Sequence, residues 1–62
     1  MAEMTVKELS AVEDTLDKEL ILIKKYRFAA SESGDRELSE HFNHAADIHK
    51  KHFNMLIGYL KA

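Results

Sequence analysis

The 62-residue chain contains no cysteine and no proline, and it has only two glycines. The absence of cysteine excludes disulfides and thiolate metal sites, and it is compatible with a reducing cytoplasm. With no proline and so little glycine, few turns can form, so long helices are the expected structure. A chain this short is near the lower size limit for folding alone, so a metal ion or a partner subunit must replace the missing disulfides.

Long apolar runs and a large net charge are also absent. The longest apolar run, residues 20–23, is far too short to cross a bilayer, and residues 1–4 have neither the basic start nor the apolar segment of a secretion signal. The formal charge of −2 gives no reason to expect nucleic-acid binding. We therefore expect a single cytoplasmic domain, residues 1–62, that binds neither nucleic acid nor membrane.

The first half of the chain has the pattern of one amphipathic helix. Thr5 and Glu8 fit a capping box, which predicts a helix over about residues 5–33. Apolar residues then recur at alternating steps of three and four, as in a heptad seam. The seam consists of Leu9, Val12, Leu16, Glu19, Ile23, Tyr26 and Ala30. Glu19 is its one residue that is ionised at neutral pH, and it occupies a position where leucine is expected.

The second half repeats this pattern after a short turn. Gly34 is placed to end the first helix in a left-handed conformation, and Asp35 to cap a second helix over about residues 35–61. The predicted seam of this helix consists of Leu38, Phe42, Ala45, His49, His52, Leu56 and Tyr59. His49 and His52 are adjacent polar members of an otherwise apolar seam.

The two helices are expected to form an antiparallel hairpin that brings the polar seam residues together. Glu19 lies fifteen residues before Gly34 and His49 fifteen residues after it, so the equal helical rise places them at the same height. His52 follows one turn later on the same face as His49. The buried carboxylate and imidazoles need partners, and either a shared metal ion or a hydrogen-bonded polar layer would supply them.

A single hairpin leaves too much apolar surface uncovered. Ile21 and Phe28 flank the seam of the first helix, and Ile48 and Met55 flank that of the second. Each helix therefore needs at least two neighbours. A homodimer of hairpins that forms a four-helix bundle is the simplest solution, and higher homo-oligomers are a second one.

The spacing of these residues resembles the rubrerythrin-like branch of the ferritin-like superfamily, and the chain is also similar to small two-helix proteins related to spore coat proteins. Glu19, Tyr26 and Ala30 match the Glu, Tyr and Ala of rubrerythrin-like first helices. Residues 42–52 match the pattern Phe-x3-Ala-x2-Glu-x2-His, with His49 in place of the Glu. The resemblance covers residues 12–60 and implies a ferritin-like bundle, with spore association as a further implication.

The resemblance also assigns roles to the three polar residues. Glu19 matches the terminal carboxylate ligand of the family, His52 matches its histidine ligand, and His49 takes the place of its bridging carboxylate. Two divalent ions in a dimer would leave a charge of about +2 uncompensated, so one ion, or two separated ions with bound anions, fits better. Iron and zinc are the expected metals, with nuclearity left open.

Two further hypotheses stay beside metal binding. One is a structural, spore-coat-like oligomerisation module in which Glu19, His49 and His52 form a metal-free polar layer. The other is a small redox or oxygenase-type enzyme that uses the same metal. Tyr26 is interpreted as a core residue, with a second-sphere or redox role near the metal as the alternative. His41 and His44 are interpreted as part of the solvated outer face, beside Glu37 and Glu40.

Overall fold

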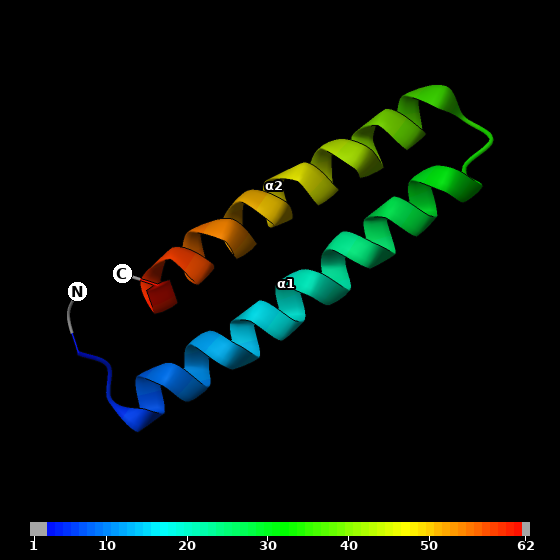
Figure 1. Cartoon of the computed structure of the whole chain (residues 1–62). Coiled ribbons are helices and arrows are strands. Elements are labelled where there is room, and N and C mark those ends of the chain that lie inside the picture. The colour runs from blue at the N-terminus through cyan, green and yellow to red at the C-terminus, as the bar shows by residue number, and fades with distance from the viewer. Residues whose placement is uncertain (1–2, 62) are drawn as a thin grey trace.

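The protein is an antiparallel helical hairpin, shown by a computed structural model that describes residues 3–61 (Figure 1). Helix α1 spans Val6–Glu32 and helix α2 spans Arg36–Lys61. The predicted bounds are therefore confirmed to within one residue, and no strand occurs in the described part. Residues 1–2 and 62 lie outside the described residues. All three belong to the predicted domain, and residues 1–2 also belong to the segment that was considered as a secretion signal.

The capping box predicted at the start of α1 is present. The Glu8 backbone N–H donates to the Thr5 hydroxyl, and the Thr5 backbone N–H donates to the Glu8 carboxylate, both at 3.0 Å. Thr5 lowers the pKa of the Glu8 carboxyl, and its backbone N–H has a larger effect than its hydroxyl. Two of the N–H groups that a helix start leaves unpaired are thus satisfied locally, as the sequence predicted.

The turn between the helices differs from the prediction at Gly34. No described residue has a positive φ, so Gly34 is not left-handed. Instead Ser33 ends α1 in an extended conformation, with φ −72° and ψ 129°. Its hydroxyl accepts from the Asp35 N–H at 3.2 Å and donates to the Asp35 carbonyl at 3.1 Å. The side chain of Ser33 therefore makes the turn that was assigned to glycine.

Helix α2 begins with the predicted aspartate cap. The Asp35 carboxylate accepts from the Leu38 backbone N–H at 2.9 Å. One turn later, the Ser39 hydroxyl donates to the Ala30 carbonyl at 2.8 Å. The end of α1 is therefore joined to the start of α2 by a side-chain bond that the sequence pattern did not indicate.

The face that α1 presents to α2 is close to the predicted seam, but α2 is rotated relative to its predicted seam. Ala30 and Ala46 are the only buried residues among those described, with 6% and 0% of their surface exposed. The inward face of α2 consists of Ser39, Phe42, Ala46, His49, Phe53, Leu56 and Leu60, all buried or half-buried. Leu38, His52 and Tyr59, predicted to lie inward, are exposed.

Competition between two overlapping seams explains the rotation. The predicted and observed seams share Phe42, His49 and Leu56, and both have steps of three and four. Placing Phe53 inside rather than His52 removes a phenyl ring from water, which stabilises the fold more than burial of an imidazole. The small side chain of Ala46 also lets the two helix backbones approach closely at the middle of the hairpin.

Arg27 of α1 forms side-chain hydrogen bonds to two residues of α2. Its guanidinium donates to the Asp47 carboxylate at 2.5 Å and to the Asn43 side-chain oxygen at 2.9 Å. This hydrogen bond from Arg27 lowers the pKa of Asp47. The side chains of Arg27 and Asp47 remain 42% and 59% exposed, so this pair contributes orientation more than stability.

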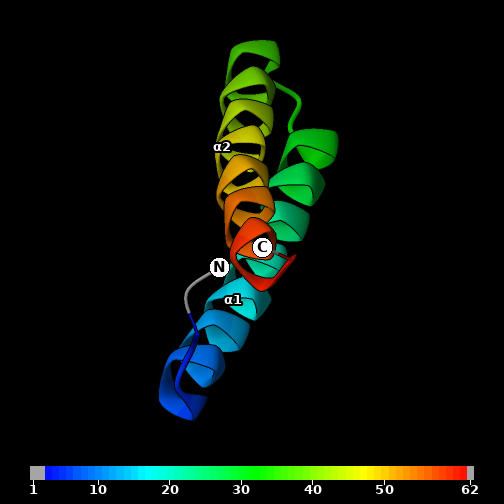
Figure 2. The same cartoon turned by 60° about the vertical axis from the view of Figure 1, so that its left-hand side comes forward.

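The hairpin forms a single layer of two helices that run side by side in Figure 1, and in Figure 2, turned by 60°, the C-terminal end of α2 comes in front of α1. Within residues 3–61, neither helix combines the length and the apolar character that a membrane crossing requires.

We predict that Gly34→Ala stabilises the protein. A Cβ at this position would meet no atom within 4 Å, and the backbone does not need the left-handed region. The substitution should therefore raise the free energy of unfolding by about 0.4–1 kcal/mol, because it restricts the unfolded chain. Thermal unfolding followed by circular dichroism measures this, with Gly58→Ala within α2 as a positive control. If Gly34→Ala instead lowers the free energy of unfolding by about 1 kcal/mol, the result would support a left-handed Gly34 and contradict the prediction.

We also predict a pH-dependent contribution from Asp47. Its pKa is lower in the folded protein than in the unfolded chain, so its contribution is complete above about pH 4 and disappears as the pH falls through the folded-state value. Thermal melts of wild type and Asp47→Asn should therefore differ most at neutral pH and converge in acid. Asp14→Asn is the control, because Asp14 forms no ion pair within residues 3–61. A gap that persists unchanged in strong acid would contradict the prediction.

Candidate metal centre

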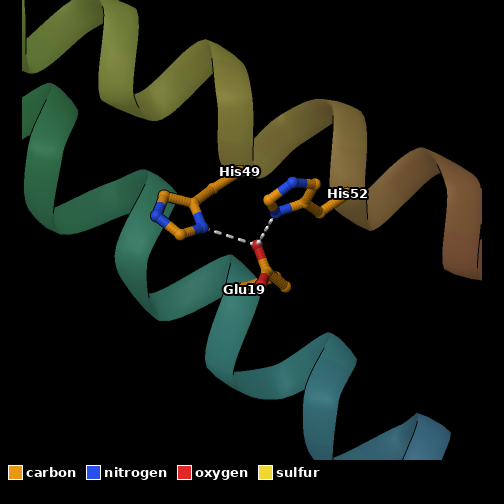
Figure 3. Close-up of side chains that lie close together, drawn as sticks. All are labelled: Glu19, His49 and His52. Carbon is orange, nitrogen blue, oxygen red and sulfur yellow. Dashed lines mark hydrogen bonds and ion pairs between the residues drawn. The ribbon is translucent and has the colours of Figure 1, made fainter.

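The three polar residues predicted to converge do lie together at the middle of the hairpin (Figure 3). Glu19 comes from α1, and His49 and His52 come from consecutive turns of α2. The distance from Glu19 Oε2 is 2.7 Å to His49 Nδ1 and 3.6 Å to His52 Nδ1. One potential ligand atom from each side chain lies within 4.8 Å of the other two. The equal-height prediction from the chain positions is thereby confirmed.

The three side chains differ in their exposure to water. The Glu19 side chain is 14% exposed and that of His49 23%, so both are largely enclosed between the helices. The His52 side chain is 49% exposed, because the rotation of α2 moves it from the inward face to its edge. The cluster is therefore closed on the hairpin side and open to solvent beside His52.

The contact between Glu19 and His49 is a hydrogen bond in which the imidazole Nδ1–H donates to the carboxylate. A carboxylate that loses water at a helix interface needs such a donor. Within residues 3–61, His49 and His52 are the ion-pair partners of Glu19, and no lysine or arginine pairs with it. Glu19 thus depends on the two imidazoles alone.

Aromatic rings hold the His49 imidazole in place. The Tyr26 ring stacks on it with a centroid distance of 5.7 Å and an angle of 12° between planes. Phe42 stacks on Tyr26 at 6.3 Å, and His52 meets His49 edge to face at 5.6 Å. The orientation of Nδ1 toward Glu19 is therefore fixed by packing as well as by hydrogen bonding.

Tyr26 is half-buried on the inward face, as the core interpretation predicted, and its stacking on His49 also places it in the position of the alternative, second-sphere residue. A signal for this aromatic group was present in the spacing. Tyr26 lies eight residues before Gly34 and Phe42 eight residues after it, so the same height count that joined Glu19 to His49 also joins these rings.

The ligand types match those of open transition-metal sites. Two imidazole nitrogens and one carboxylate oxygen occur together in catalytic zinc and non-haem ferrous centres with open positions. Two ligand atoms bound tetrahedrally to one zinc ion lie about 3.4 Å apart, given bond lengths of about 2.0–2.2 Å. The 3.6 Å distance from Glu19 to His52 is close to that value, and the 2.7 Å distance to His49 would have to widen by less than about 1 Å.

The other two histidines lie outside this cluster, as predicted. His41 and His44 are exposed and line a shallow surface depression with Glu37 and Glu40. In the part of the chain that the structure describes, Glu19, His49 and His52 are the only three acidic, histidine or cysteine residues that come within mutual metal-binding distance.

Comparison with protein-family models, with curated proteins and with solved structures gives no match to this chain.

We predict that removing His49 alone destabilises the metal-free protein, whereas removing Glu19 and His49 together does not. His49→Leu leaves an enclosed carboxylate without its hydrogen-bond donor, which costs about 1–3 kcal/mol. Glu19→Leu with His49→Leu should return the stability to the wild-type value or above, because leucines fill the seam. Urea unfolding in the presence of a chelator measures both effects.

The matched control for these variants is His44→Leu, which changes an exposed histidine of the same helix and should alter stability by less than about 0.5 kcal/mol. If the double variant is less stable than His49→Leu alone, the polar pair is needed for folding and the prediction is wrong.

Proposed function

We propose that this protein binds a transition-metal ion through Glu19, His49 and His52. The observation that carries the proposal is the convergence of one carboxylate and two imidazoles from two helices, with their ligand atoms within 4.8 Å of one another. Such a set has a substantial desolvation cost in so small a protein, and a shared cation offsets that cost for all three residues at once.

The local structure supports this function because the ligands are held before any metal arrives. His49 is held beside Glu19 by their hydrogen bond and by stacking on Tyr26. A cation bound between Nδ1 and the carboxylate would replace this hydrogen bond and displace the Nδ1 proton, while the stacking on Tyr26 keeps the ring in place. His52 is the exposed member, which gives an ion a route to the site and leaves coordination positions for water. Three protein ligands with open positions are typical of catalytic rather than structural zinc sites.

The two imidazoles and one carboxylate favour iron or zinc, and they favour a small number of metal ions per chain. One carboxylate per chain offsets half the charge of a divalent ion, so a second ion next to the first would be poorly compensated. We therefore propose one ion per ligand set.

We further propose that two hairpins associate into a ferritin-like four-helix bundle. Support comes from the nearly absent core, since Ala30 and Ala46 are the only buried residues among those described. The spacing shared with rubrerythrin-like helices agrees with such a bundle, and His49 in place of a bridging carboxylate indicates a metal site that differs from the one in that family.

Metal binding can be tested on untagged protein after treatment with a chelator. Calorimetric titration with zinc and, without oxygen, with ferrous iron should give one site per chain. At a free metal concentration of about 100 times Kd, the folded state gains about 2.7 kcal/mol, which raises Tm by roughly 10–20 °C. Replacing Glu19, His49 or His52 by alanine should weaken binding by more than the roughly 10- to 100-fold loss that follows removal of an outer-shell partner.

The control is the double variant His41→Ala with His44→Ala, which removes two exposed histidines and should leave the affinity unchanged. Weak binding that this control abolishes would place the metal on the outer face and contradict the proposal. A protein whose Tm does not respond to zinc, iron or manganese would instead be the structural module with a metal-free polar layer, held by the Glu19–His49 hydrogen bond.

A further inference from the structure

Helix α2 carries a second heptad stripe that its partner helix leaves uncovered, which we call the outer stripe. Its members alternate at steps of three and four along the whole helix: Leu38, His41, Ala45, Ile48, His52, Met55 and Tyr59. None is an aspartate, glutamate, lysine or arginine. Leu38, Ile48, Met55 and Tyr59 are 40–58% exposed, a high value for large apolar side chains on one continuous face.

The total exposed surface of the chain is larger than that of a self-contained protein. It amounts to 4966 Å², whereas a globular monomer of 7.1 kDa exposes about 4,100 Å². The excess of about 900 Å² is close to the roughly 800 Å² that each partner buries in an interface of standard size. The hairpin therefore has the surface of one half of a dimer.

We propose that the outer stripe binds the outer stripe of a second copy of this chain, with the two α2 helices antiparallel across a two-fold axis. The stripe is self-complementary in this arrangement. Leu38 and Tyr59 lie equally far from its midpoint, as do Ala45 and His52, so the axis sets Leu38 opposite Tyr59 and the small Ala45 opposite His52. Ile48 lies near the midpoint and meets its own copy.

The charges of α2 favour the same direction. The half before the midpoint carries one positive and three negative residues, Arg36, Glu37, Glu40 and Asp47. The half after it carries Lys50, Lys51 and Lys61 and no acidic residue. An antiparallel pair places each acidic half beside a basic half, whereas a parallel pair would place like charges together.

The proposed dimer also covers the open side of the metal centre. His52 belongs both to the outer stripe and to the ligand set, so a partner helix on the stripe separates the cluster from bulk water. Metal binding and association would then strengthen each other, because each orders the same side chain. This consequence rests on the proposed metal-binding function, whereas the dimer itself does not.

The face can be tested by sedimentation velocity on chelator-treated protein over a concentration series. Wild type should be a dimer. Ile48→Glu, which brings two carboxylates together at the axis, and Met55→Glu should each raise the dimer Kd by at least about tenfold. The control variants Ser10→Glu and Lys25→Glu introduce a carboxylate at exposed polar positions of α1 that the proposed interface does not use, and they should remain dimeric.

Circular dichroism on the same samples shows whether each variant is still helical, which separates loss of the dimer from loss of folding. Loss of helicity in Ile48→Glu but not in the controls supports the proposal, because the hairpin then needs a partner on that face. A wild-type protein that is helical and monomeric overturns the proposal. The proposal is also overturned if the α1 control variants dissociate as much as the α2 variants do, or if only the control variants dissociate. If the wild type is a helical monomer that still binds zinc, the proposed dimer is wrong and the metal-binding proposal stands. If the wild type is a dimer that does not bind metal, the dimer stands and the metal-binding proposal is wrong.

The antiparallel direction has a separate test, since the chain has no native cysteine. Leu38→Cys mixed with Tyr59→Cys should give a cross-linked heterodimer with a short thiol reagent. Leu38→Cys alone should not cross-link, because the two copies of position 38 lie about 30 Å apart in the proposed pair. Efficient cross-linking of Leu38→Cys to itself would show a parallel pair and overturn the proposed symmetry.

Discussion

The contact between Glu19 and His49 fixes how the two helices are aligned, and the arrangement of the site follows from that alignment. It places a charged oxygen between two helices and satisfies it with one imidazole at 2.7 Å. A slip of one helical turn would move the partners apart by about 5.4 Å and leave the carboxylate enclosed without a donor. The bond therefore sets the register of the hairpin, which apolar side chains spaced at regular intervals would specify only weakly.

The packing around this bond is aromatic, although the protein has almost no buried core. The Tyr26 ring stacks on the imidazole of His49 and on the ring of Phe42, and Ala30 and Ala46 are the two buried residues among those described. For the proposed metal site, this stacking would limit the freedom that the imidazole loses when an ion replaces its hydrogen bond to Glu19.

His52 lies at the boundary between the two surfaces that define this molecule. It reaches inward to Glu19, and it also belongs to the uncovered stripe on the outside of α2. A chain of 62 residues buries little apolar surface by itself. If the proposed metal site and the proposed dimer both form, His52 serves both of them.

The sequence by itself determined the features that depend on neighbouring residues and on helical rise. These are the capping box at Thr5, the aspartate cap at Asp35, both helix lengths and the equal height of Glu19 and His49. Each follows from local hydrogen bonding or from a constant rise per residue, which distant parts of the chain do not alter.

Only the tertiary structure decided the rotation of α2. The stripes that contain His52 and Phe53 have the same spacing, so periodicity could not show which one faces α1. The choice depended on which side chains gain most from contact with the other helix, and Phe53 gains more than His52. The form of the turn was missed for a different reason, because the hydroxyl of Ser33 bonds to Asp35 two residues further on, a local alternative that made a left-handed Gly34 unnecessary.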